Sequence, residues 1–309
     1  MSTTPVHTEA DDRPLIGIAA AAGSVLMLSL MNVFAKLLSD THHVAEIAFY
    51  RNVIALLPFL AVIVLFSRYD ILKINSKPNA LIARSVVGTA SLITTFAAFA
   101  VLPLADGQAF LFTASLFVPV LGYFVLREKV GPYRWSAVIV GFIGVLIMVR
   151  PTGHLNLLGV GLALSAALMH ATLGTLLRLL GRTERPETVT FYFLLIGAIL
   201  TLPAMPFVAT VPARDELLLF LGAGLTGAMA QLLLSVAYKN APAALATIFN
   251  YTGIIWATAF GWFIWGDWPA LPVWIGAGII IASSLVIVWR EQHIARKVTP
   301  VPPGPALPK

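Results

Sequence analysis

Three ionisable side chains stand inside long apolar stretches of the sequence, where a charge is costly. Arg51 and Glu46 share one such stretch, and His170 lies in another. A guanidinium in that setting can hold a carboxylate with two hydrogen bonds, whereas a carboxylate or an imidazole can exchange a proton. Arg51 is therefore a candidate substrate anchor, and Glu46 and His170 are candidate coupling groups.

Each of these groups also has a structural interpretation. Arg51 can instead satisfy backbone carbonyls, pair with Glu46 or extend to the outer surface. Glu46 can stabilise the positive N-terminus of its helix, and a neutral His170 can serve helix packing. Lys36, at the end of an earlier apolar stretch, is expected to extend to the outer surface. The sequence leaves these alternatives open.

Uncharged polar and aromatic side chains in the apolar stretches are further candidates. An amide in hydrocarbon needs a hydrogen-bond partner, which can be a substrate or a neighbouring helix. Two aromatic rings can enclose a planar or apolar group, or they can simply pack together. The candidates for substrate contact are Arg51, Tyr50, Asn32, Phe112, Gln108, Asn250 and Tyr251.

Motifs for catalysis, metal binding or phosphate binding are missing from the sequence. The chain has no Cys, and Asp40, His42 and His43 are the only adjoining potential metal ligands. A metal site needs three or four ligands that converge. Glycine-rich phosphate loops, nucleophile elbows and metalloprotease motifs are absent. We therefore expect a protein that is not an enzyme and has no cofactor and no metal.

The composition explains why these polar groups stand in apolar surroundings. Of 309 residues, 59% are hydrophobic and only 11% are charged, whereas soluble proteins carry about 25% charged residues. The mean hydropathy is +0.89. This balance excludes an ordinary soluble enzyme, a disordered chain and a nucleic-acid partner, and it predicts an all-α integral membrane protein in a lipid bilayer.

Apolar runs long enough to cross a bilayer fill most of the chain. A spanning helix needs roughly 20 apolar residues. The expected spans are Leu15–Ala35, Ala45–Ser67, Ser85–Ala105, Gly107–Leu126, Trp135–Val149, Leu155–Leu177, Thr188–Ala213, Leu217–Tyr238, Asn240–Gly266 and Trp268–Trp289. Ten transmembrane helices put both termini on one side. With both termini in the cytoplasm, most of the 20 Lys and Arg residues fall in cytoplasmic loops, as the positive-inside rule requires.

An internal repeat divides these ten helices into two sets of five. At one fixed spacing, residues of the first half recur in the second: Gly88, Pro103, Phe112, Glu128 and Trp135 correspond to Gly227, Pro242, Tyr251, Asp267 and Trp274. Because five is odd, the second set begins on the opposite side of the membrane, which makes the repeat inverted. Inverted repeats are typical of alternating-access transporters. The expected parts are a cytoplasmic tail (1–13), the first repeat (14–150), the second repeat (151–290) and a cytoplasmic Pro-rich tail (291–309).

Several local motifs resemble the EamA-type branch of the drug/metabolite transporter superfamily. They are the segments 46–52 and 102–106, Pro119, Arg127-Glu128-Lys129, and the glycine-rich segment 141–148. The second half departs from the first, with Thr258 in place of Pro119, Asp267 in place of Glu128 and Phe193 in place of Arg51. The resemblance implies a ten-helix transporter whose third, fourth, eighth and ninth helices surround the substrate cavity.

The resemblance also implies a class of substrates. We expect a secondary transporter in the bacterial inner membrane that exports an amino-acid-like or amino-acid-derived zwitterionic compound, such as an amino acid or an opine-type metallophore. The alternative is an importer of a nucleoside-like or flavin-like metabolite, such as S-adenosylmethionine or riboflavin. A minor alternative is a membrane protein that transports nothing. The small-molecule substrate is the expected partner, and a homodimer remains open.

Overall fold

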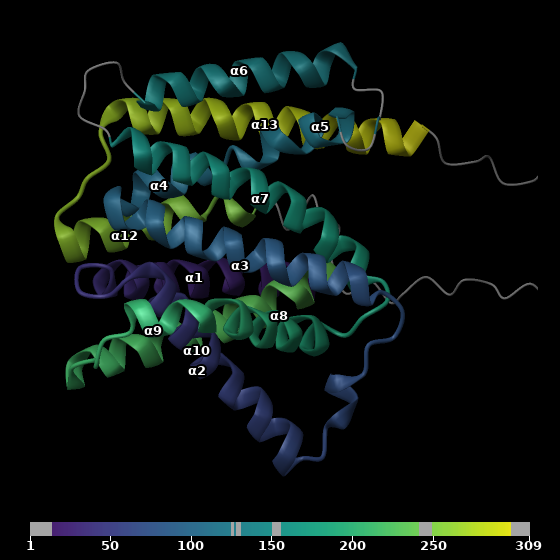
Figure 1. Ribbon diagram of the computed structural model, residues 1–309. Coiled ribbons are helices and arrows are strands. Elements are labelled where there is room, and N and C mark those ends of the chain that lie inside the picture. Colours follow the sequence, from purple (N-terminus) through teal and green to yellow (C-terminus); the bar gives the residue numbers. More distant parts are fainter. Residues whose placement is uncertain (1–13, 125–126, 128–130, 150–155, 241–248, 298–309) are drawn as a thin grey trace, which may run out of the picture.

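The computed structural model describes residues 14–124, 127, 131–149, 156–240 and 249–297, and within these ranges the chain is helical without a strand (Figure 1). The tails 1–13 and 298–309 lie outside the described residues, as do Glu128 and Pro242 of the repeat. Long helices run side by side across the molecule, with helix ends and loops gathered at its two ends (Figure 1). This arrangement suits a bundle that crosses a bilayer.

The helices of the first half are α1 (Pro14–Leu38), α2 (Val44–Leu65), α3 (Pro78–Val101), α4 (Leu104–Leu111), α5 (Ala114–Phe124) and α6 (Pro132–Val149). Those of the second half are α7 (Leu157–Gly181), α8 (Pro186–Thr201), α9 (Met205–Val208), α10 (Arg214–Asn240), α12 (Gly253–Trp265) and α13 (Leu271–Lys297). Short 3₁₀ turns, η1 (Tyr69–Leu72) and η2 (Leu202–Ala204), lie between them.

The prediction of ten membrane-spanning segments is confirmed. Eight segments are long and apolar enough to cross a membrane, with α4 and α5 forming one of them and α8 to α9 another. Gly253–Trp265 and Leu271–Ile287 are shorter apolar helices at the ninth and tenth expected positions. Chain-local signals set several ends: Pro78 and Pro186 begin α3 and α8, and Gly266 ends α12 at a φ of 71°. At this φ a residue without a β-carbon avoids strain.

One expected boundary is wrong in a way that matters for function. The apolar run predicts a third span that begins at Ser85, but α3 begins at Pro78 and includes Arg84, which is only 2% exposed. Proline suits the first turn of a helix because it lacks the N–H that would stay unpaired there. Arg84 is therefore inside the bundle and does not belong to the loop that precedes it.

The helices of the two halves are interleaved in space. α1 packs along α10, and α3 packs along α7. Since α1 corresponds to α7 and α3 corresponds to α10 in the repeat, these two contacts are equivalent. α2 packs on α8, α4 on α12 and α6 on α13, and each of these pairs joins corresponding helices of the two halves. The packing thus has the two-fold symmetry of an inverted repeat.

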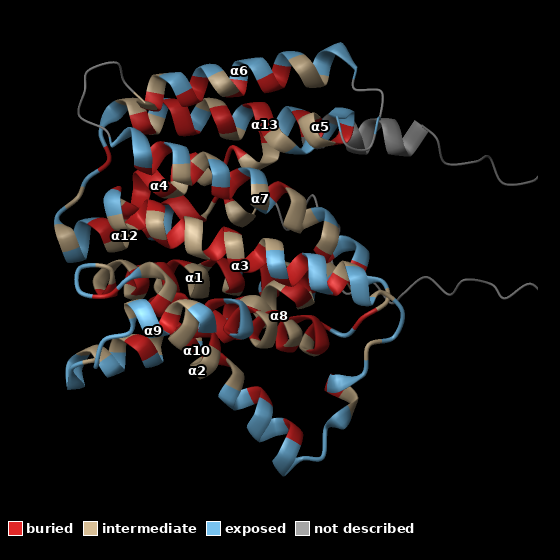
Figure 2. Cartoon of the chain, viewed as in Figure 1, coloured by how far each residue is buried: buried red, intermediate tan, exposed pale blue. Residues whose placement is uncertain are grey.

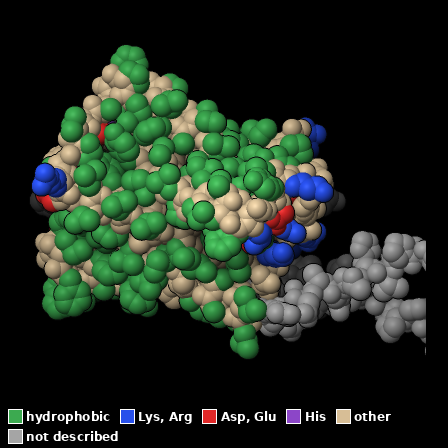
Figure 3. Space-filling view, turned by 90° about the horizontal axis from the view of Figure 1, so that it is seen from below, with side chains coloured by type: hydrophobic (Ala, Val, Ile, Leu, Met, Phe, Trp, Pro, Cys, Tyr) green, Lys and Arg blue, Asp and Glu red, His purple; other side chains and the backbone are tan. Residues whose placement is uncertain are grey.

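The outer surface of the bundle is apolar. Large exposed side chains such as Leu57, Leu146, Ile199 and Phe263 lie on its outside, whereas the buried residues line the contacts between helices (Figure 2). In the view of Figure 3, hydrophobic side chains cover most of the face, and Lys and Arg gather mainly at one end. This pattern matches a belt in contact with lipid and a charged end in water.

Lys36 does not extend to the outer surface as expected. Its Nζ donates hydrogen bonds to the carbonyls of Phe99 (3.0 Å) and Leu102 (2.6 Å), at the end of α3, and lies 5.4 Å from the centre of the Trp265 ring. A cation is favourable at a helix C-terminus, where the last carbonyls have no partner within the helix. Lys36 therefore ties α1 to α3.

Glu184 holds the connection between α2 and α3 at the end of the bundle. The buried carboxylate accepts hydrogen bonds from the backbone N–H groups of Asn75 (2.9 Å), Ser76 (2.9 Å) and Lys77 (3.3 Å), just before α3 begins. Near it, Asp70 pairs with Arg68 and Arg185 in a more exposed position. Hydrogen bonds from Arg68 hold the pKa of the Asp70 carboxyl below its usual range.

We expect Glu184→Ala to destabilise the protein by about 1–3 kcal/mol, because three backbone donors lose a charged acceptor at once. Thermal unfolding of the purified protein and proteolysis within residues 66–77 measure the effect. Asp70→Asn is the matched control, since exposed ion pairs contribute little. Equal losses in the two variants would mean that the Glu184 contacts do not hold this connection.

Candidate functional site

Two helices are interrupted at corresponding positions of the repeat. α4 ends at Leu111 and α5 begins at Ala114, so Phe112 and Thr113 lie in a turn. In the second half, Tyr251 and Thr252 lie in a turn just before α12. Interrupted helices at matching positions of two inverted halves are typical of a transporter's binding region, because irregular backbone within a membrane is tolerated only inside protein or along a cavity.

The two interruptions have the same local chemistry. The Thr113 hydroxyl donates to the carbonyl of Phe110 and the Thr252 hydroxyl donates to the carbonyl of Phe249, both at 2.7 Å. Each threonine thereby satisfies a carbonyl near the end of its helical segment. The repeat thus preserves the interruption and the hydroxyl that stabilises it.

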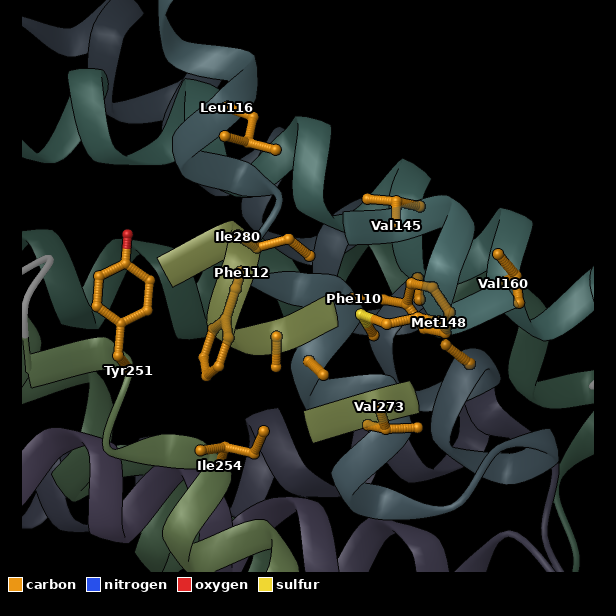
Figure 4. Close-up of a cluster of buried hydrophobic side chains, with 14 of the residues drawn as sticks. Phe110, Phe112, Leu116, Val145, Met148, Val160, Tyr251, Ile254, Val273 and Ile280 are labelled. Atoms are coloured by element: carbon orange, nitrogen blue, oxygen red, sulfur yellow. The ribbon is translucent and has the colours of Figure 1, made fainter. Parts of the chain in front are cut away.

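The aromatic side chains at the two interruptions meet each other. The rings of Phe112 and Tyr251 are 5.2 Å apart in a T-shaped contact, and both side chains are buried. Figure 4 shows them side by side above Ile254, with the Tyr251 hydroxyl pointing away from that residue. The hydroxyl faces Ser115 and Ser284 without a hydrogen bond of ordinary geometry. The aromatic pair expected from the repeat therefore exists, but here the rings pack on one another.

Arg51 is completely buried in α2. Its Nη1 donates to the Asn52 side-chain oxygen at 2.7 Å, whereas Nε and Nη2 have no hydrogen-bond partner. It does not pair with Glu46, extend to the surface or bond to backbone carbonyls. A buried guanidinium with two unpaired N–H groups is expensive, because the cost of removing the charge from water is not compensated.

Arg84 is a second buried arginine of the same kind, and its place at the edge of an apolar run does not mark it as a candidate. Its Nη2 donates to the Gln231 side-chain oxygen at 2.5 Å, and its Nε and Nη1 have no partner. The guanidinium carbons of Arg51 and Arg84 lie 5.5 and 4.0 Å from the centre of the same ring, that of Phe193. The two guanidinium groups, on α2 and α3, are thus neighbours, and both lie near the Phe193 ring of α8.

Glycines make room for this cluster symmetrically. A β-carbon on Gly227 would lie 2.4 Å from Nε of Arg51, and one on Gly88 would lie 2.9 Å from the Phe193 ring. Gly88 corresponds to Gly227 at a spacing of 139 residues, and Arg51 corresponds to Phe193 at a spacing of 142 residues. Each glycine therefore accommodates the large side chain of the other half. At these equivalent contacts the first half contributes the Arg51 guanidinium, and the second half contributes the Phe193 ring.

Glu46 belongs to a separate polar group at the end where α2 and α10 begin. It is fully buried and accepts a hydrogen bond from the backbone N–H of Thr210 at 2.9 Å. The His42 ring lies between two carboxylates, with Nδ1 3.2 Å from Glu46 and Nε2 3.1 Å from Glu216. The imidazole thus joins carboxylates of α2 and α10, which belong to different halves of the repeat.

The other candidate residues are spread over the bundle. Tyr50 packs edge-on against Phe220 at 5.1 Å, and the buried Asn32 has no partner for its side-chain oxygen. Gln108 packs on Gly253, whose β-carbon would lie 2.8 Å from its Nε2. Asn250 is half-buried beside Tyr251.

His170 stands apart from these groups. It is exposed on α7 and contacts the carbonyl of Ala166, one turn earlier. Its ring is not paired with a carboxylate in the part of the chain that the structure describes. The structure therefore brings Phe112 and Tyr251 together and gives Arg51 a cationic neighbour, but it does not gather all the candidates at one point.

The chemistry that these groups offer is the binding of a charged or polar ligand. Among residues 14–124, 127, 131–149, 156–240 and 249–297, no three His, Asp or Glu side chains are placed to hold a metal ion. The buried arginines offer hydrogen-bond donors to an anion, and the His42 group offers an imidazole between two carboxylates. Both lie at contacts between helices of different halves.

Known transporter sequences are similar to this chain along most of its length. A model of the EamA-like transporter family matches residues 15–150 and 157–289. A riboflavin transporter of Rhizobium johnstonii is 32% identical over 70% of this chain and 72% of its own. The pseudopaline exporter CntI of Pseudomonas aeruginosa is 26% identical over 89% of this chain and 96% of its own.

Two further similarities cover nearly the whole chain. An S-adenosylmethionine uptake transporter of Rickettsia bellii is 26% identical over 91% of this chain and 96% of its own. A crystal structure with 16% sequence identity superposes with a TM-score of 0.63 over 93% of this chain and 99% of that one. This last likeness concerns the fold alone.

Proposed function

The chain belongs to the EamA-like transporter family, and from this membership we propose that it exports a small amino-acid-like or amino-acid-derived zwitterion across a bacterial inner membrane. The observation that carries the proposal is Arg51. A fully buried guanidinium with two unpaired N–H groups suits the carboxylate that every such zwitterion possesses. The likeness to an exporter over 89% of the chain supports the direction.

The proposed mechanism is alternating access without a nucleotide. The substrate binds between the two halves, with Arg51 holding its carboxylate and the interrupted segments at Phe112 and Tyr251 bordering its path. Glu46 is the proposed coupling group, because it is a fully buried carboxylate with the His42 ring beside it, and Glu216 lies on the other side of that ring. We propose that both termini face the cytoplasm, where the basic loops belong.

A flavin-like substrate taken up by the cell is the second candidate. The 32% identity to a riboflavin transporter favours it, as does the aromatic pair at the interrupted helices. A planar ring system entering between Phe112 and Tyr251 would replace their contact with each other by stacking on the ligand.

Metabolite profiling of cells and medium tests both candidates. We compare a deletion strain, the same strain complemented with the gene, and the strain carrying the empty vector. For an exporter, one carboxylate-bearing compound accumulates inside the deletion strain, disappears from its medium, and returns to normal on complementation. A compound left unused in the medium identifies an importer instead. No difference between strains, under conditions where the protein is present in the membrane, would contradict transport of a cellular metabolite.

A further inference from the structure

The cluster formed by Arg51, Asn52, Arg84, Phe193 and Gln231 carries two positive charges and no negative one. Arg51 and Arg84 make no ion pair with a carboxylate among the described residues. Glu46, on the same helix as Arg51, is engaged by Thr210 and His42 at the end of the bundle. Arginine does not lose its proton in proteins, so both charges persist.

The cluster also has more donors than acceptors. Nε and Nη2 of Arg51, Nε and Nη1 of Arg84, and Nδ2 of Asn52 are buried without a hydrogen-bond partner. The protein supplies two acceptors, the side-chain oxygens of Asn52 and Gln231. Buried polar groups are otherwise nearly always paired, and a group of unpaired donors at one place indicates a missing acceptor.

The two positive charges of the cluster determine how many negative charges the acceptor must carry. One carboxylate would neutralise one guanidinium and leave the other uncompensated in a medium of low dielectric constant. Two negative charges neutralise both. A phosphate, or two carboxylates close together, supplies two charges and enough oxygens for the unpaired donors.

The conformation described here keeps one of the arginines covered. Nε and Nη2 form the edge with which arginine grips a carboxylate, and a β-carbon on Gly227 would lie 2.4 and 2.7 Å from these two atoms. The edge therefore faces the backbone of α10. A ligand reaches it when α2 and α10 separate, and these helices belong to different halves of the repeat.

We propose that Arg51 and Arg84 together bind a doubly negative end of the substrate, either a phosphate or a pair of carboxylates, when α2 and α10 separate. This inference rests on the proposed transport function and narrows it, because a substrate with one carboxylate leaves Arg84 unpaired. Arg84, Asn52 and Gln231 join Arg51 as determinants of specificity.

The test measures binding without transport. Purified protein in detergent is unfolded by heat, and Tm is followed by tryptophan fluorescence, with inorganic phosphate, succinate, acetate or chloride at matched ionic strength. We expect a saturable rise in Tm of roughly 3–6 °C with phosphate or succinate and little with acetate. A larger response to phosphate identifies a phosphorylated substrate, and a larger response to succinate identifies a dicarboxylate.

Three variants separate this site from general salt effects, since phosphate stabilises most proteins to some degree. Gln231→Glu places a carboxylate against Arg84, so we expect a higher Tm without ligand and loss of the saturable response. Arg84→Gln should abolish the preference for two charges over one. Arg182→Gln removes an exposed arginine and should respond like the wild type.

Two results would overturn the proposal: an equal response to acetate and succinate, or an unchanged response in Gln231→Glu. Neither result bears on whether the protein transports, which metabolite profiling decides on its own. Conversely, a saturable response that is lost in Gln231→Glu supports the anion site even if profiling identifies no substrate.

Discussion

Replacing Arg51 by Met is expected to stabilise the protein while it lowers substrate transport. The guanidinium is fully buried and two of its N–H groups are unpaired, so hydrogen bonds do not fully offset its desolvation free energy. Exchanging such a group for an apolar side chain of similar length is expected to raise stability by about 1–4 kcal/mol. Substrate flux should fall at least about tenfold, because the carboxylate loses its partner.

The control for this prediction is Lys36→Met on the neighbouring helix α1. The Lys36 ammonium donates to two carbonyls at the end of α3, so its removal should lower Tm. The two substitutions remove one cation each and are expected to move Tm in opposite directions. Flux of the compound found by profiling, divided by the amount of protein in the membrane, gives the transport result. A loss of Tm in Arg51→Met would show that the arginine serves the fold.

Gly276→Val is expected to have the largest effect on stability. α6 and α13 approach so closely that a β-carbon on Gly276 would lie 2.3 Å from Cγ of Met148 and 2.5 Å from the carbonyl oxygen of Gly144. The second contact is with backbone, which cannot rotate away as a side chain can. The helices must therefore move apart, and we expect a loss of about 3 kcal/mol or more.

Gly278 provides the matched control on the same helix. A β-carbon at this position meets nothing within 4 Å, so Gly278→Val should leave the stability nearly unchanged. Thermal unfolding and the monodisperse fraction after detergent extraction measure both variants. If the two valines behaved alike, the close approach of α6 and α13 would not contribute to stability.

Much of the fold was predictable because hydropathy and repeat spacing are properties of the chain itself. The ten spans follow from apolar runs, and the pairing of Phe112 with Tyr251 follows from the spacing that also relates Gly88 to Gly227. In the structure these two rings lie 5.2 Å apart, a contact that the spacing alone does not imply. The interruptions at the two rings were not predictable, since Thr113 and Thr252 are compatible with an unbroken helix.

Which residues form the arginine cluster was harder to predict from the sequence. Arg84 stands next to the start of an apolar run, so in the sequence it looks like a residue of the preceding cytoplasmic loop. Only the packing of α3 against α8 and α10 shows that it is buried. The sequence offers Glu46 as a partner for Arg51, but residues five positions apart lie on different faces of a helix. Which side chains from other helices surround a charge depends on tertiary packing, which a single sequence does not display.

The interleaving of the halves has a consequence for biosynthesis. α1 is among the first segments to leave the ribosome, yet it packs along α10, which is synthesised only after most of the chain. α3 likewise packs along α7, which is synthesised later. Until these partners arrive, the polar side chains of the early helices, Arg51 and Arg84 among them, must be sheltered from lipid by the insertion machinery or by water. Neither half is expected to fold when expressed alone, although each carries a complete set of five spans.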